Sequence, residues 1–155
     1  MPDRSLLHLT VAAVVYYQQR FLLVEERDKN SGALVLNQPA GHVEAGEDLL
    51  SAVRRELQEE TGLDLTPTAW LGISQLHAAN GHFYYRVNFV FEPATLPENY
   101  QPQDPDILAL HWLSADELQQ AALPVRSSLV SHAISEYLQG VRLSLATLQR
   151  MVRMV

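Results

Sequence analysis

The chain has 155 residues, 47% of them hydrophobic and 19% charged, with a net charge of −7 at pH 7. This composition is that of an ordinary globular protein, and the length suits one domain better than two. We therefore expect a single domain over residues 1–155, with its core at about 8–140 and a C-terminal tail at 141–155. The eleven basic residues are scattered apart from one adjacent pair, which argues against general binding of nucleic-acid backbones.

Two further absences limit the function. No apolar run approaches the roughly 20 residues that a membrane-spanning helix needs. The sequence contains no cysteine, which excludes disulfide bonds and thiolate metal sites. The first nine residues, MPDRSLLHL, include an acid and lack the long apolar core of a secretory signal. A cytoplasmic location is the resulting expectation.

The first third of the chain predicts strands. Residues 9–17, LTVAAVVYY, are apolar and rich in β-branched side chains, which indicates a buried strand. Two glutamines then favour a turn into a second strand at 20–26, so the pair should form a hairpin. Residues 27–32 are polar and form a predicted loop, followed by a short extended run at 33–36. Pro39 ends regular structure, and Gly41 and Gly46 frame a loop that leads into a helix.

The predicted helix runs from about Asp48 to Thr61, with Gly62 in the position that commonly ends a helix. Leu50, Val53 and Leu57 have the spacing of a buried stripe. The glutamates of this helix are expected beside that stripe, toward the outside.

The remaining elements complete a mixed α/β domain. Residues 64–75 are extended in this prediction, and 84–91 alternate in the manner of a strand. Residues 93–106 contain four prolines and indicate a long surface loop, a common place for substrate contacts. Another strand follows at 107–113, then a short helix from Ser114 to Gln120 and an amphipathic helix at 127–138. After Gly140 the tail is expected to be irregular to weakly helical.

Three glutamates of the first helix carry the main chemical signal. Glu56, Glu59 and Glu60 stand at i, i+3 and i+4, so a helix places them on one side. Like charges at this spacing destabilise an isolated helix. A hard divalent cation, which prefers carboxylate oxygens, would offset that cost. A solvated, salt-bridged helix face is the alternative.

The full spacing of residues 41–63, GHVEAGEDLLSAVRRELQEETGL, resembles the Nudix box. The matching positions are Gly41, Glu47, Arg55, Glu56, Leu57, Glu59, Glu60, Gly62 and Leu63. The resemblance extends to the flanking strands and implies the Nudix fold, an α/β fold in which a mixed β-sheet is sandwiched between helices (α/β/α). It also implies a hydrolase that cleaves phosphoanhydrides with Mg²⁺, for which Mn²⁺ is a possible substitute.

The resemblance assigns roles within the box. Glu59 and Glu60 are the implied inner-sphere metal ligands, and Glu56 is a further ligand or the base that orients water. A backbone carbonyl of Ala40 or, alternatively, Gly41 is expected to complete the site. Arg55 is expected to hold a box glutamate in place. Structural roles are expected for Gly41, Glu47 and Gly62.

Outside the box the candidates are weaker. Asp106 is the expected auxiliary ligand or base, with Asp104 in reserve, and both also suit a solvated loop. Four residues are candidate substrate contacts: Arg27, His42, Tyr85 and Arg126. Surface solvation is the alternative for the two arginines and packing is the alternative for Tyr85, whereas His42 stands out because it follows Gly41 at the start of the box.

The C-terminal third narrows the resemblance to one bacterial subgroup, the NudJ-type phosphatases. Residues 125–130 and 137–145 carry it, and Ser128 departs from it because a proline is expected there. The subgroup implies release of orthophosphate from nucleoside tri- and diphosphates, and from thiamine-pathway pyrophosphates. The alternatives are a pyrophosphohydrolase of linked nucleoside diphosphates and a non-catalytic nucleotide sensor. A small phosphorylated molecule is the expected partner, and the chain is expected to be a monomer or weak homodimer.

Overall fold

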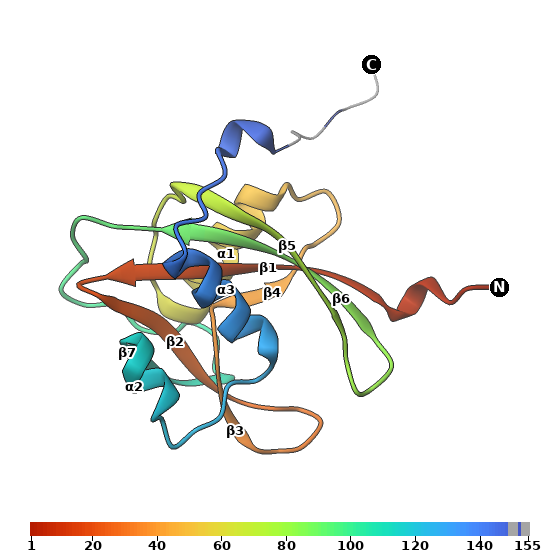
Figure 1. The fold of residues 1–155 in the computed structure, drawn as a ribbon, viewed down its shortest axis with the longest axis horizontal. Coiled ribbons are helices and arrows are strands. Elements are labelled where there is room, and N and C mark those ends of the chain that lie inside the picture. Colours follow the sequence, from red (N-terminus) through yellow and green to blue (C-terminus); the bar gives the residue numbers. More distant parts are fainter. Residues whose placement is uncertain (149–151, 153–155) are drawn as a thin grey trace.

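The computed structural model describes residues 1–148 and Val152. Seven strands and three helices follow each other in mixed order (Figure 1). Their bounds are β1 (Leu7–Tyr17), β2 (Arg20–Arg27), β3 (Leu34–Asn37), β4 (Ala40–His42), α1 (Leu49–Thr61), β5 (Ala69–His77), β6 (Phe83–Phe91), β7 (Ile107–Leu113), α2 (Ala115–Gln119) and α3 (Ser128–Leu138). Short 3-10 turns lie at Arg4–Leu6 and Leu145–Thr147. No helix in this described part is long and apolar enough to cross a membrane.

The strands form two groups that are joined by one hairpin. The first group has the order β4-β1-β6-β5, with β1 and β6 parallel and the other pairs antiparallel. In the second group β2 pairs with both β3 and β7. Between the groups, β1 and β2 pair only at the hairpin end, where Tyr16 lies opposite Phe21 and Tyr17 opposite Arg20. The sheet therefore splits beyond the hairpin, and the short strand β4 lines the split.

Helices cover both faces of the sheet, which confirms the predicted α/β/α arrangement. Alternate residues of β1 (Val11, Ala13, Val15) pack in one core with α1. Val14, on the opposite side of the same strand, packs in a second core with α3. In Figure 1, α3 crosses in front of the sheet and α1 lies behind it. Because both sides of β1 are buried, its sequence is a continuous apolar run rather than an alternating one.

The orientation of α1 differs from the predicted one. Leu50 is 36% exposed, whereas Glu56 and Glu60 are only 9% and 6% exposed. Val53 and Leu57 are buried as predicted. The prediction placed Leu50 in the core and the glutamates outside because sequence patterns treat carboxylates as solvated. Here the helix is rotated so that two carboxylates face the sheet, next to β4.

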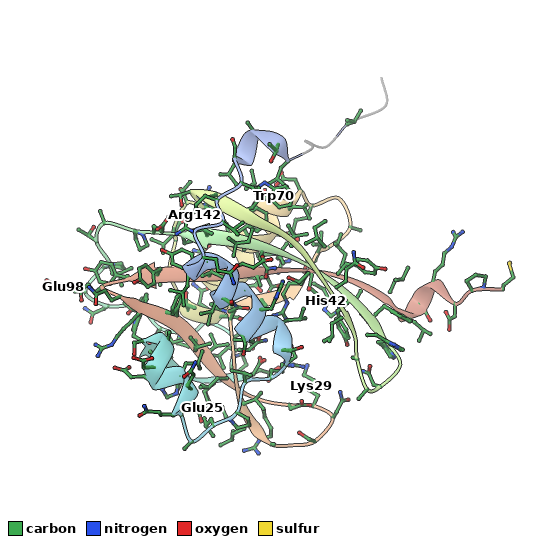
Figure 2. The ribbon with its side chains drawn as sticks, in the orientation of Figure 1. Glu25, Lys29, His42, Trp70, Glu98 and Arg142 are labelled. Atoms are coloured by element: carbon green, nitrogen blue, oxygen red, sulfur yellow. The ribbon has the colours of Figure 1, made fainter. Side chains whose placement is uncertain are left out.

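The segment after α3, residues 141–148, forms hydrogen bonds with the edge strand β5. Residues 141–148 are irregular apart from the 3-10 turn, as predicted, and the tail residues 149–151 and 153–155 lie outside the described residues. The backbones of Leu143 and Trp70 exchange two hydrogen bonds across the edge of β5. The indole nitrogen of Trp70 also donates to Thr147, at 2.9 Å. Figure 2 labels Trp70 and Arg142 at this edge.

Candidate active site

The helix α1 is fixed at both ends. At its start, the Asp48 side chain accepts a hydrogen bond from the Ser51 amide, a typical N-cap. At its end, Gly62 has φ of +79°, and a side chain there would overlap the backbone of Gln101. The carbonyl of Glu59 accepts from the amides of Gln103 and Asp104. The proline-rich loop is thereby held against the carboxylate end of the helix.

Glu60 is a buried carboxylate that makes a single described hydrogen bond. Its Oε2 accepts from the Ala40 amide of β4 at 3.0 Å. Burial raises the pKa of Glu60 to about 9, the Ala40 amide opposes this shift, and the charges of Glu26, Glu56 and Asp104 add to it. A carboxylate in such surroundings favours a counter-cation or a proton. Glu60 therefore meets the requirement for a cation ligand.

Glu56 lies directly against the backbone of Gly41. A side chain at Gly41 would overlap the Glu56 carboxylate, so only glycine leaves room for it. Burial raises the pKa of Glu56, and a hydrogen bond and the charge of Arg55 partly offset that rise. The first glycine of the box is thus explained by space for a carboxylate.

Arg55 connects the glutamates to the loop before the helix. Its Nε and one terminal nitrogen bind the two oxygens of Glu47, at 2.6 and 2.8 Å. The other terminal nitrogen binds Glu56 at 2.7 Å and Glu59 at 3.3 Å. Arg55 also donates to the carbonyl of His42 at 3.0 Å. The hydrogen bond from Arg55 lowers the pKa of Glu47. Arg55 and Glu47 together brace the loop and orient two glutamates.

The hydrogen-bond ladder distinguishes between the two candidate backbone ligands. Pro39 and Val43 bond to β1, through the Ala13 amide and the Leu9 carbonyl. In an antiparallel ladder alternate residues bond to the neighbour, so Gly41 points to β1 and Ala40 points away from it. The Ala40 amide accordingly reaches Glu60, and the Ala40 carbonyl faces the same side. Ala40 is therefore better placed than Gly41 to offer a carbonyl ligand.

The chemical type of these donor groups suits a hard divalent cation. The donors are carboxylate and carbonyl oxygens, which Mg²⁺ and Mn²⁺ prefer. Within residues 1–148 and Val152, no three acidic or histidine groups already converge as a metal site. The hydrogen bonds explain this, because Arg55 holds Glu56 and Glu59 while Glu60 turns to Ala40. The burial of the Glu60 carboxyl, which has the Ala40 amide as its described partner, is the observation that favours a cation.

Asp104 is better placed than Asp106. The Asp106 side chain is 71% exposed and lies 3.9 Å from Lys29. The Asp104 carboxylate instead helps to raise the pKa of Glu60, and its backbone is bonded to Glu59. Of the two candidates, only Asp104 has a backbone amide bonded to α1, and the auxiliary role of either residue stays a prediction.

A second polar cluster lies beside the carboxylates, and the sequence prediction includes only its Arg126. Arg126 donates to Glu26 at 2.6 Å, and Asn37 donates to the same oxygen at 3.0 Å. Arg86 is 8% exposed, its Nε has no hydrogen-bond partner, and one terminal nitrogen lies 3.4 Å from the Asn37 oxygen. Burial lowers the pKa of Arg86 to about 10, with Arg126 lowering it and Glu26 and Glu60 raising it. An arginine in the middle of a strand pattern was the available signal.

The predicted substrate contacts fall into two groups, those near the carboxylates and those away from them. His42 follows Gly41 on β4, and its pKa is lowered by burial, by His8 and by Arg126. Arg27 donates to the Gly32 carbonyl and so holds its own loop. Tyr85 pairs with Leu9 and Gln75, on the opposite side of β6 from Arg86. The structure therefore brings His42 and Arg126 toward the carboxylates and leaves Arg27 and Tyr85 apart from them.

A hollow elsewhere on the molecule does not contain these groups. It encloses about 650 Å³ and is lined by Glu98, Asn99, Tyr100, Gln101, Leu110 and Trp112. Figure 2 places Glu98 and His42 on opposite sides of the molecule. Since phosphoanhydride chemistry needs a metal and its carboxylates, we assign the site to the box rather than to this hollow.

Comparison with known proteins identifies the family. Residues 6–132 match the NUDIX domain. The chain belongs to the Nudix hydrolase family. It is 41% identical over 135 residues to Phosphatase NudJ of Escherichia coli strain K12. The aligned region covers 87% of this chain and 86% of that protein. The NudJ of Shigella flexneri matches equally.

Solved structures agree with this assignment. A Nudix hydrolase from Nitrosomonas europaea superposes with a TM-score of 0.84 at 36% identity, covering 93% of this chain and 97% of that one. A MutT Nudix hydrolase from Burkholderia pseudomallei, at 24% identity and a TM-score of 0.68, shares the fold. The chain is thus an enzyme of the family that hydrolyses nucleotide phosphoanhydrides, and such hydrolases generally use a divalent metal.

Proposed function

We propose that this Nudix hydrolase is a Mg²⁺-dependent phosphatase that releases orthophosphate from nucleoside tri- and diphosphates. Thiamine-pathway pyrophosphates are further candidate substrates. The carboxylate network of α1, held against Ala40 by a buried Glu60, carries the proposal. The identity to Phosphatase NudJ over 87% of the chain supports the choice of orthophosphate as product.

In this proposal Glu56, Glu59 and Glu60, with the Ala40 carbonyl, hold the metal. The bound cation supplies neutralisation of phosphoryl oxygens and activation of water. Arg55 holds the carboxylates of Glu56 and Glu59 by hydrogen bonds and so would orient them for the cation. Alternatively, Glu56, with a raised pKa, would be the base that accepts the proton from the attacking water instead of a metal ligand.

Arg86 and Arg126 are the proposed phosphate-binding cations. The Nε of Arg86 lacks a protein partner, and a phosphate oxygen provides a matching acceptor. Arg126 is held by Glu26, which also accepts from Asn37.

Product analysis with Mg²⁺ tests the proposal. Orthophosphate and pyrophosphate are assayed separately on a panel of nucleoside tri- and diphosphates and thiamine diphosphate. Orthophosphate from the best substrate is expected, and pyrophosphate as the product would instead indicate a pyrophosphohydrolase. Glu60→Gln should lose about 4 kcal/mol of transition-state stabilisation, or roughly 10³-fold in kcat. Glu98→Gln, at the hollow, is the matched control and should retain activity.

A further inference from the structure

A polar strip crosses the face of the sheet that α3 partly covers. On β6 the side chains of Tyr84, Arg86 and Asn88 share this face, because they are two residues apart. Their direct neighbours on β1 are His8, Thr10 and Ala12. Thr10, Arg86 and Asn88 are buried, and each has a side-chain atom without a hydrogen-bond partner. Buried polar atoms of this kind are normally satisfied, so the strip lacks a polar counterpart.

The strand register gives the approximate distance of each residue pair in this strip from the proposed metal site. Ala12 lies opposite Ala40, whose amide binds Glu60, so this row marks the metal end. The next row on the same face contains Thr10, His42 and Arg86, and the row after it contains His8 and Tyr84. At 3.2–3.4 Å per residue, these rows lie roughly 7 Å and 13 Å from the metal end. From the metal end outward, the first row lies at the proposed metal, the second row contains the guanidinium of Arg86, and the third row contains the aromatic rings of His8 and Tyr84.

An aromatic cluster is centred on the last row, and we define it as His8 and Tyr84 of that row, His42 of the row before it and His82 just before β6. His8 stacks on Tyr84 with a centroid separation of 4.6 Å and an angle of 14°. Its two nitrogens contact His42 at 3.0 Å and His82 at 2.6 Å. With both nitrogens engaged, the His8 ring is fixed before any ligand arrives. The cluster contains no acidic group that would repel a polyphosphate.

We propose that the aromatic cluster binds the planar heteroaromatic ring of the substrate's leaving group, with its phosphate chain over Arg86 and its reacting phosphate at Glu60. A nucleoside diphosphate leaving group has this order of parts: phosphate, sugar and ring. The inference rests on the proposed function for the direction of the chain. It adds that recognition of the ring depends on His8 of β1, on Tyr84 of β6 and on His82 just before it, all outside the Nudix box, together with His42 at the start of the box.

The test compares substrates with and without a ring. His8→Ala and Tyr84→Leu are assayed with nucleoside triphosphates and with inorganic tripolyphosphate, both with Mg²⁺. For the nucleotide, KM should rise roughly tenfold, since loss of one aromatic contact to a base typically has such an effect. For tripolyphosphate, KM should remain unchanged, and kcat should change little with either substrate. Tyr84→Phe, which keeps the ring, should behave like the natural enzyme.

Phe83→Leu is the matched control. Phe83 precedes Tyr84 on β6, so its side chain faces the other side of the sheet. Its ring stacks on His77 with a centroid separation of 4.3 Å. Its replacement should leave both KM values unchanged. Equal effects of His8→Ala on both substrates, or none on the nucleotide, would overturn the proposal.

A binding measurement separates this inference from the proposed function. Calorimetric titration in EDTA, with the four common nucleoside diphosphates and with pyrophosphate, measures binding without turnover, because the proposed hydrolysis depends on Mg²⁺. His8→Ala should weaken binding of the preferred nucleoside diphosphate roughly tenfold and leave pyrophosphate unaffected. If the enzyme proves inactive on all anhydrides, the proposed function fails while this titration still decides on the ring site. If the natural protein binds none of the four better than pyrophosphate, the ring site is wrong.

Discussion

Glu60 and Gly41 show how single residues of the box depend on their surroundings. Glu60 enters the protein interior because α1 turns it toward the Ala40 amide. Gly41 leaves the space that the Glu56 carboxylate occupies. The identities of these residues were readable from the sequence, but their burial was not. Sequence patterns score a glutamate as exposed, whereas packing against β4 decides its real environment.

Replacement of Gly41 by alanine tests the space for Glu56. The added methyl group overlaps the Glu56 carboxylate and should displace it from Arg55 and from the proposed metal. We expect kcat/KM to fall roughly 10- to 100-fold, as for other residues that orient metal ligands. Steady-state kinetics at several Mg²⁺ concentrations measures the effect. Gly46→Ala is the control for glycine replacement in the same loop, since open space surrounds Gly46. It should retain metal affinity, although its positive φ reduces stability.

At the scale of elements, the pattern of strands and helices was largely predictable. Apolar and alternating runs indicated β1, β2, β6 and β7, cap residues indicated α1 and α2, and amphipathic spacing indicated α3. The extended run predicted at 64–75 was too long at its start, since β5 begins at Ala69. The parallel pairing of β1 with β6 was not predictable because no local signal encodes a partner far along the chain. Arg86 was missed for the same reason: its contacts come from other strands.

The junction between α1 and the proline-rich loop gives a prediction at this scale. Gly62→Ala forces a non-glycine residue to a φ of +79° and against the Gln101 backbone. We expect a loss of about 1–3 kcal/mol in the free energy of unfolding. Denaturant titration measures this loss. Gly32→Ala is a control with similar φ but open surroundings, so the difference between the two variants isolates the overlap. Equal losses would show that the Gln101 contact contributes nothing.

For the whole molecule, the buried carboxylates link stability to pH. The pKa of Glu60 is about 9 in the folded state against an ordinary 4.5, so the folded state retains a proton that the unfolded state releases. Without metal, the free energy of unfolding should be highest below pH 4.5 for this group and fall as the pH rises toward 9. Glu56 contributes with the same sign. The pKa of Glu47 is lowered, so its contribution is constant across this range.

Thermal unfolding between pH 5.5 and 8.5, with EDTA or with Mg²⁺, measures this linkage. The metal-free Tm should decline with pH more steeply than in Glu60→Gln, which has no proton to lose. Saturating Mg²⁺ should raise Tm more at pH 8.5 than at pH 5.5, because the cation binds the ionised carboxylate. A Mg²⁺ effect that is independent of pH, or one that persists unchanged in Glu60→Gln, would exclude Glu60 as a ligand.

The parallel pair of β1 and β6 has a consequence for how the enzyme acquires its site. β1 leaves the ribosome among the first elements, yet Leu7 to Val15 pair with residues 83–91. During synthesis the apolar edge of β1 therefore stays without this partner while the whole Nudix box is being made. Closing so long a loop is entropically costly and slows folding. Refolding should place the carboxylates late, when β6 docks, and the nascent chain is most prone to aggregate before that step.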